Sequence, residues 1–232
     1  MVLTTLLRDL RDIIWPRTCE VCGRTLLDGE QLLCLHCLAA MPRTHLHLSP
    51  FNSIHQRLAR NTPIERAGAM MTYRRGGEYS ALIRRGKYND RPEIIRTLAM
   101  MYASELKADG FFEGIDIILP VPMHRWKKIR RGYNQSEVIA DGISKVTGIP
   151  VGDNLRATRG HKTQTRRSSF ERYQNVSSIF EVRYPEELTG LHILLVDDVI
   201  TSGATLHSCA KTLADTVGGI RISIATLATA AN

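Results

Sequence analysis

The segment VDDVITSGAT, residues 196–205, joins two regular patterns. The stretch Leu191–Val196 before it, apolar except for His192, predicts a buried strand, and the helical spacing of apolar residues in Thr205–Leu213 predicts a helix. Two adjacent carboxylates, Asp197 and Asp198, come directly after the strand. Ligands of open parallel sheets collect where strands lead into helices, so this segment predicts a binding loop at the carboxyl edge of a sheet.

The turn into the helix has the residue types that hold a phosphate. Gly203 lets backbone amides approach an anion, hydroxyls add donors, and a helix N-terminus favours negative charge. The carboxylates would repel a phosphate, so we expect them to face ribose hydroxyls or a cation. An acid-rich turn with an N-cap would account for one acid and one hydroxyl, but not for the whole run. The expected ligand contacts are Asp197, Asp198, Thr201, Ser202, Gly203, Ala204 and Thr205.

Strand-like and helix-like patterns alternate along most of the chain. The expected strands are Ala67–Tyr73, Ile115–Leu119, Leu191–Val196 and Ile220–Leu227, and the expected helices are Arg91–Leu106, Gln135–Val146 and Thr205–Leu213. Such alternation indicates βαβ units. The fold class predicted is therefore α/β, a mainly parallel sheet flanked by helices on both sides.

Two Cys-x-x-Cys pairs, Cys19 with Cys22 and Cys34 with Cys37, lie near the N-terminus. Four thiolates at this spacing can complete the tetrahedral shell of a structural zinc ion and leave no open position for catalysis. We expect residues 1–50 to form an amphipathic helix followed by a zinc ribbon, and residues 60–232 to form the α/β domain. Residues 41–60 have no clear periodicity and are expected to be a linker, where His45 and His47 fit an exposed loop better than a metal pair.

Net charge and apolar content limit the partners and the cellular compartment that we expect for the protein. The 232 residues carry a net charge of +8, so a polyanion, whether a phosphorylated metabolite or a nucleic acid, is a plausible partner. The apolar runs fall short of the ~20 residues of a membrane-spanning helix, and the N-terminal residues lack the pattern of a signal peptide. We therefore expect a cytoplasmic, reducing location, where paired cysteines hold metal more often than they form disulfides.

Basic residues offer candidate contacts for such an anion. Lys87, Arg125 and Arg131 are expected to face the ligand. A second basic run, Arg156–Arg172, could close over phosphates as a lid. It could equally bind single-stranded nucleic acid, with nearby aromatic residues stacking on bases. The fifth cysteine, Cys209, is expected to be a buried small apolar residue.

Several separate blocks resemble one known family. Residues 196–205 look like the signature of type I phosphoribosyltransferases, and the chain as a whole resembles the ComF/GntX family. Besides the cysteines, the blocks are Leu82–Tyr88, Leu119–His124, Arg131-Gly132-Tyr133-Asn134-Gln135-Ser136, and Gln164 with Arg172 and Asn175. The resemblance thus spans nearly the entire chain, and the block beginning at Arg131 is the most family-specific.

The resemblance implies a ligand and leaves two functions open. The ligand would be phosphoribosyl pyrophosphate or a related ribose 5-phosphate with Mg²⁺, and the catalytic residues would be Asp197 and Asp198. One function is pentosyl transfer to an acceptor that the sequence does not name, and whether turnover occurs stays open. The other is a single-stranded DNA-binding competence protein that works with the competence machinery in DNA uptake and natural transformation.

Overall fold

A computed structural model describes residues 16–59, 62–88, 91–124, 128–129, 131–158 and 179–230. Its centre is a four-stranded sheet in the order β1-β6-β5-β2, in which every neighbouring pair is parallel. The strands are β1 (Ile64–Tyr73), β2 (Ile117–Pro120), β5 (His192–Ile200) and β6 (Arg221–Ala230). The parallel sheet expected from the sequence is confirmed.

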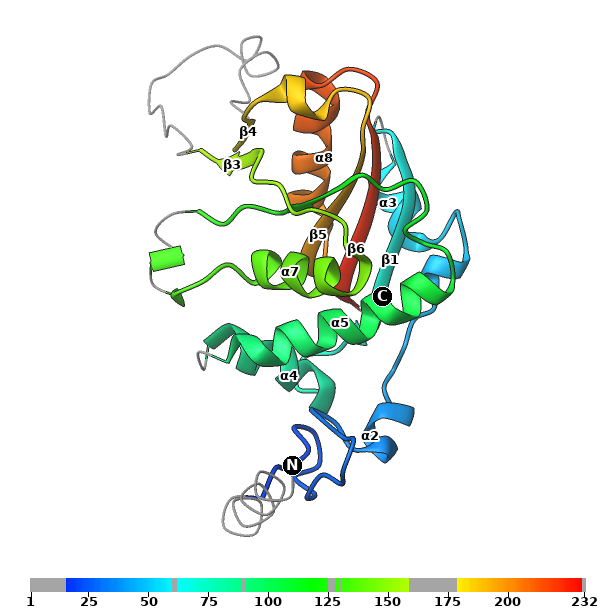
Figure 1. The fold of residues 1–232 in the computed structure, drawn as a ribbon, viewed down its shortest axis with the longest axis vertical. Helices are drawn as coiled ribbons and strands as arrows, with labels where there is room; N and C mark the ends of the chain where they lie inside the picture. Colours follow the sequence, from blue (N-terminus) through cyan, green and yellow to red (C-terminus); the bar gives the residue numbers. More distant parts are fainter. Residues whose placement is uncertain are drawn as a thin grey trace, which may run out of the picture.

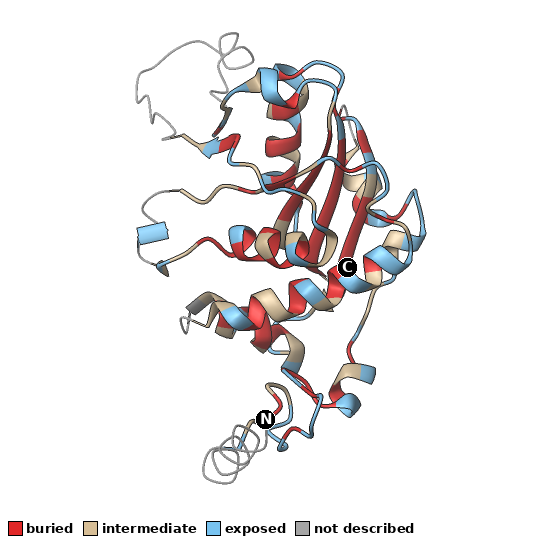
Figure 2. Cartoon of the chain, viewed as in Figure 1, coloured by how far each residue is buried: buried red, intermediate tan, exposed pale blue. Residues whose placement is uncertain are grey.

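Helices cover both faces of this sheet (Figure 1). On one face lie α5 (Pro92–Ala108) and α7 (Gln135–Thr147), and on the other lie α3 (Ser53–Leu58) and α8 (Ala204–Thr216). Side chains of β5 point alternately to the two faces of the sheet. Leu194 lies in the apolar core under α5 and α7, and Leu195 lies in the core under α3 and α8. Burial is continuous along the strands and one-sided on the helices (Figure 2). This is why the central part of β5, Ile193–Val196, is apolar at every position while the helices are amphipathic.

The expected strands and helices are all present, with one difference that matters for the site. Strand β5 continues past Val196 to Ile200, because its pairing with β6 extends to Ile200 opposite Thr229. Asp197 and Asp198 therefore sit on the strand itself.

A small antiparallel pair stands beside the sheet, formed by β3 (Leu155–Ala157) and β4 (Phe180–Val182). Strand β4 packs against α8, and a 3-10 turn, η2 (Pro185–Leu188), leads on to β5. Most of the basic run Arg156–Arg172 lies outside the described residues, as do Gln164 and Asn175, and so does the expected N-terminal helix.

Residues 41–60 are not a plain linker. They form a 3-10 turn, η1 (Leu46–Leu48), and α3, and the side-chain amide of Asn52 donates to backbone oxygens of Leu46, Ser49 and Ala67. The expectation of an exposed histidine loop is wrong for His47, whose side chain is buried against Asp109 with 2.9 Å between Nε2 and Oδ2. Turns this short have no periodicity to detect, and the acidic partner Asp109 lies far along the chain, at the C-cap of α5.

The segment that holds the four clustered cysteines, called the N-terminal module below, packs on the helical layer through α4 (Glu78–Tyr88). The sequence patterns did not predict this helix. The module contains α2 (Leu35–Ala39), and its buried Cys19, Cys34 and Cys37 share one apolar cluster with Leu82 and Ile83 of α4. Within the described part of the chain, no helix combines the length and the apolar character needed to cross a bilayer.

Candidate functional site

The carboxyl ends of β2 and β5 and the start of α7 meet at one point. Asn134 caps α7, since its Oδ1 accepts from Ser136 N at 3.2 Å while its Nδ2 donates to Val121 O, just past β2, at 3.0 Å. The cap fixes Ser136 beside β5, where its hydroxyl donates to Asp197 Oδ1 at 2.9 Å. The same oxygen accepts from the backbone N–H of Asp198 at 2.9 Å. Asp197 is thus held in a defined orientation.

The surroundings of Asp197 disfavour the charged form of its carboxyl group. Burial raises its pKa to about 7, and the negative charge of Asp198 adds to the rise, while the hydrogen bonds from Asp198 N and Ser136 and the charge of Lys87 oppose it. The group is therefore poised between neutral and ionised forms near neutral pH. Paired carboxylates in such an environment are frequent at functional sites.

Lys87 reaches the acid pair from α4. Its Nζ lies 2.6 Å from Asp198 Oδ2, and both side chains are largely shielded, at 22% and 13% exposure. The last turn of α4 thus delivers an ammonium group to the end of β5, and the local charge at Asp198 is balanced. A ligand that carries its own charges would have to exchange partners with this pair.

The loop between β5 and α8 turns at a glycine that directly precedes the helix. Gly203 has φ of +80°, in the left-handed region where other residues are strained, and it precedes the 13-residue helix α8. Residues of α3 support the loop from behind, because Arg57 donates to Thr201 O and a Cβ on Gly203 would lie 2.9 Å from Leu58. A small hollow of about 30 Å³ is lined by Asp197, Val199, Ile200, Thr201, Ser202, Gly203, Ala204, Thr205 and Leu206.

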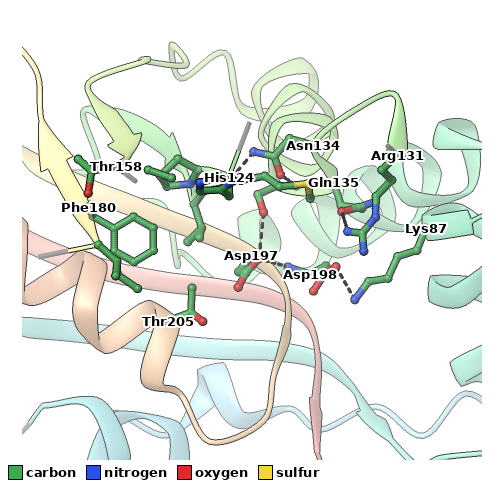
Figure 3. A pocket seen from close by; sticks show the side chains of 16 residues that line it. Lys87, His124, Arg131, Asn134, Gln135, Thr158, Phe180, Asp197, Asp198 and Thr205 are labelled. Atoms are coloured by element: carbon green, nitrogen blue, oxygen red, sulfur yellow. Dashed lines mark hydrogen bonds and ion pairs between the residues drawn. The ribbon is translucent and has the colours of Figure 1, made fainter. Parts of the chain in front are cut away.

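A larger cavity of about 540 Å³ adjoins this hollow, within the roughly 300–1,000 Å³ typical of ligand sites. Figure 3 shows Asp197, Asp198 and Thr205 on one side of it and His124, Asn134, Gln135 and Arg131 on the other. Lys87, Val121, Pro122, Met123, Ser136, Ala157, Thr158, Ile179 and Phe180 complete the lining. Thr205 and Asp197 border both spaces, so one elongated ligand can occupy them together.

The structure brings most of the expected site residues together. Asp197, Asp198, Thr205, Lys87 and Arg131 line the large cavity, and Thr201, Ser202, Gly203 and Ala204 line the small hollow. Arg125 lies outside the described residues. Arg131 Nη1 donates to Gln135 Oε1 at 2.6 Å, which links the basic group to the start of α7.

Among the other lining residues, Gln135 and Ser136 belong to the family-specific block that begins at Arg131, although the sequence predicts no individual role for them. They also begin a predicted helix that follows a predicted strand, as ligand-binding residues of α/β folds commonly do. Phe180 and Thr158 had no usable signal. Their positions depend on the pairing of β3 with β4, two three-residue strands too short to show a pattern.

The four expected metal ligands also converge. The Sγ atoms of Cys19, Cys22, Cys34 and Cys37 all lie within 4.8 Å of one another. Cys22 and Cys34 are 3.8 Å apart, matching the ~3.8 Å edge of a tetrahedron with ~2.3 Å zinc–sulfur bonds. The N–H of Cys37 and the side chain of Arg24 lower the pKa of Cys34 to about 6, whereas burial and the neighbouring thiols raise that of Cys37. Four thiolates this close require a cation, and the set is compatible with structural zinc.

Comparison with known proteins agrees with this geometry. Residues 97–232 match the family model described as the phosphoribosyl transferase domain. The chain belongs to this phosphoribosyltransferase family. Its relatives include competence protein F of Haemophilus influenzae, 34% identical over 139 residues that cover 58% of this chain and 61% of that protein, so the match spans less than two thirds of it.

Two further relatives of this phosphoribosyltransferase-family chain match over greater length. DNA utilization protein YhgH of Escherichia coli strain K12 is 29% identical over 84% of this chain and 83% of its own. Competence protein ComFC of Bacillus subtilis is 22% identical over 87% and 86%. Among solved structures, glutamine phosphoribosylpyrophosphate amidotransferase of B. subtilis with ADP and GMP aligns at 21% identity and a TM-score of 0.40, covering 56% of this chain and 25% of that one. The ComF-type resemblance expected from the sequence is confirmed by the relatives.

Proposed function

We propose that the protein binds phosphoribosyl pyrophosphate, or a related ribose 5-phosphate, together with Mg²⁺. The observation that carries the proposal is the junction of the two spaces at Asp197 and Thr205: a hollow lined by a loop at a helix N-terminus opens into a cavity with an acid pair and two basic side chains. A sugar phosphate has matching parts in the same order, an anionic 5-phosphate next to neutral vicinal hydroxyls.

Each group has a role that follows from its chemistry. Thr201, Ser202, Gly203, Ala204 and Thr205 would hold the 5-phosphate with amides and hydroxyls at the positive end of α8. Asp197 and Asp198 would accept hydrogen bonds from the 2- and 3-hydroxyls of the ribose. Lys87 and Arg131, with Arg125, would balance the charge of the pyrophosphate.

Magnesium fits this arrangement. Mg²⁺ is commonly bound through one or two carboxylates plus the phosphates of a ligand, and Asp197 and Asp198 supply carboxylate oxygens at the cavity wall. When bound, the ion would neutralise pyrophosphate charge. The zinc site has a different task, since four thiolates close the coordination shell and the bound ion would stabilise the N-terminal module.

The chemistry that such a site can support is pentosyl transfer. Pyrophosphate would leave the anomeric carbon as a nitrogen nucleophile adds, and the protein would contribute position and charge stabilisation. The acceptor would enter at the end of the cavity that Phe180 and Thr158 line. We place this activity in the cytoplasm, where a reducing environment keeps the four thiols available for metal.

Binding of phosphoribosyl pyrophosphate tests the proposal. Isothermal titration calorimetry with Mg²⁺ should show saturable binding to the wild-type protein. We expect Thr205→Val to weaken it about tenfold, because one phosphate donor is lost, and Asp198→Asn about tenfold or more, because a charged acceptor is lost.

A matched control is Asp215→Asn, which makes the same chemical change at an exposed site on α8, where Asp215 pairs with Lys211. Its affinity should equal that of the wild type. Absence of heat with folded wild-type protein, or equal binding by all three variants, would rule out the assigned site.

A second candidate function is binding of single-stranded DNA in DNA uptake. The relatives named competence protein and DNA utilization protein, together with the net charge of +8, favour it. If about four phosphates are contacted, affinity for a thymidine oligonucleotide should fall about fiftyfold between 50 and 200 mM salt. Fluorescence anisotropy measures this.

The site variants separate the two functions. DNA affinity that survives Asp198→Asn and Thr205→Val would mean that DNA and the sugar phosphate occupy different surfaces. If these variants lose affinity for both DNA and the sugar phosphate, DNA enters the same cavity. If the wild-type protein binds no DNA, or binds it with an affinity that does not depend on salt, the DNA function is rejected.

A further inference from the structure

The N-terminal cysteine module and the ligand cavity are connected by one helix. The module contacts α4 at several points, and α4 delivers Lys87 to Asp198. Tyr79, in the first turn of α4, donates its hydroxyl to Cys37 O at 2.7 Å. The opposite end of α4 is the one that carries Lys87, and it is held by a different residue of the module.

That residue is Glu20, which lies inside the first Cys-x-x-Cys turn. Arg85, in the last turn of α4, donates through Nη1 to Glu20 O at 2.6 Å and to Glu20 Oε2 at 2.9 Å. Arg91, at the N-cap of α5, donates to Glu20 Oε1 at 2.8 Å. One carboxylate, itself only 14% exposed, therefore ties the end of α4 to the beginning of α5.

The packing around Lys87 makes its position depend on these contacts. Gly86, the neighbour of Lys87, lies so close to α5 that a Cβ there would be 2.4 Å from Ile95 Cγ1. The lack of a side chain at Gly86 allows α4 and α5 to pack closely at this point. Lys87 itself has a long, flexible side chain, so a small displacement of the helix end would change where its ammonium group rests.

We infer that Glu20 is a positioning residue for the ligand site, acting through Arg85 and Arg91 to hold Lys87 against Asp198. The cysteine module is then more than a stabilising appendage, because it determines how a cationic group meets the ligand. The effect on ligand affinity rests on the proposed function, whereas the position of Lys87 can be tested without any ligand.

Chemical labelling measures that position. A short pulse of acetic anhydride acylates lysine amines, and mass spectrometry gives the rate at each one. Lys87 should react slowly in the wild type and about three to five times faster in Glu20→Gln, because the amine would be released from Asp198. Arg85→Gln removes the same contact from the α4 side and leaves the cysteine turn unchanged, so it should give the same increase even if Glu20→Gln disturbs the module.

Two comparisons keep the labelling specific. Glu93→Gln makes the same chemical change on a partner of Arg91, 2.7 Å from its Nε, but outside the module, and should leave the Lys87 rate unchanged. Lys211, which pairs with Asp215 on α8, serves as an internal reference. Unchanged Lys87 labelling in both Glu20→Gln and Arg85→Gln overturns the inference.

Affinity for phosphoribosyl pyrophosphate with Mg²⁺ provides the second readout. Lys87→Met should weaken binding about tenfold, Glu20→Gln about threefold, and the double variant no more than Lys87→Met alone, because Glu20 acts through Lys87. Additive losses would contradict the inference. Faster labelling in a protein that binds no phosphoribosyl pyrophosphate would support the positioning role and reject the proposed function.

Discussion

Protein carrying Cys34→Ser is expected to purify without zinc, whereas the wild type retains about one ion per chain. Cys34 is fully buried and lies 3.8 Å from Cys22, and its Sγ also accepts from Cys37 N at the start of α2. Serine keeps a side-chain acceptor for that N–H and is a favourable N-cap. A loss of zinc would therefore result from the missing metal ligand and not from a missing helix cap. Atomic emission spectroscopy measures the metal content.

The same variant should lose stability. Binding free energies of zinc-finger sites are on the order of 10–16 kcal/mol, and part of this supports the fold around the ion. We expect a loss of at least about 3 kcal/mol, a fall in Tm of about 6–12 °C, and fast hydrogen exchange in the module. Cys209→Ala is the control, since Cys209 is buried on α8 away from the cluster and its loss should leave zinc in place. A Cys34→Ser protein that retained zinc would contradict the assignment.

Asp197→Asn should stabilise the ligand-free protein, and more so at high pH. The unfolded carboxyl group ionises near 3.8, whereas in the folded protein its pKa is raised to about 7. Between these values the folded state holds a proton that the unfolded state has released, so stability falls as pH rises and levels off above pH 7. The full difference between the folded and unfolded pKa corresponds to about 4 kcal/mol of stability. We expect about half of this, because Asp197 borders the cavity and solvent there reduces the cost of its charge.

Asparagine does not ionise and can still accept the hydrogen bonds from Ser136 and Asp198 N. Its stabilising effect should therefore be about 1 kcal/mol larger at pH 8 than at pH 5, since part of the effect is already present at pH 5. Urea unfolding at both pH values measures the difference. Asp215→Asn, at an exposed pair, should show no such pH dependence. An equal effect at both pH values, or a destabilised variant at pH 8, would show that Asp197 is not held near neutrality by its surroundings.

Much of the fold could be predicted from local patterns, because most of the longer elements have the apolar pattern of the layer that they occupy. Ile193–Val196 is apolar because β5 is covered on both faces, and α5 and α7 are amphipathic because each covers one face of the sheet. The helix α4 could not be predicted, and neither could the short elements α3, β3 and β4. They exist through tertiary contacts, among them the three hydrogen bonds from the Asn52 amide.

The candidate site divides in a similar way. Asp197, Asp198 and the loop through Thr205 are contiguous, so the sequence alone placed them in one site. Residue type and the family resemblance predict Lys87 as a ligand contact. Its ion pair with Asp198, in contrast, depends on where α4 packs. Ser136 belongs to the family-specific block, but its contact with Asp197 could not be predicted, because Ser136 lies on α7 and Asp197 on β5, far apart in the sequence.

By itself, the sequence determined the α/β class, the parallel sheet, the four-cysteine set and the 196–205 segment, because these depend on spacing along the chain. Only the tertiary structure decided that Asp197 accepts a hydrogen bond from Ser136 and has a pKa raised to about 7. The same holds for the contact of Glu20 with Arg85 at the end of α4. These properties come from burial and from contacts between distant segments. Packing of whole layers creates them, and no local pattern encodes them.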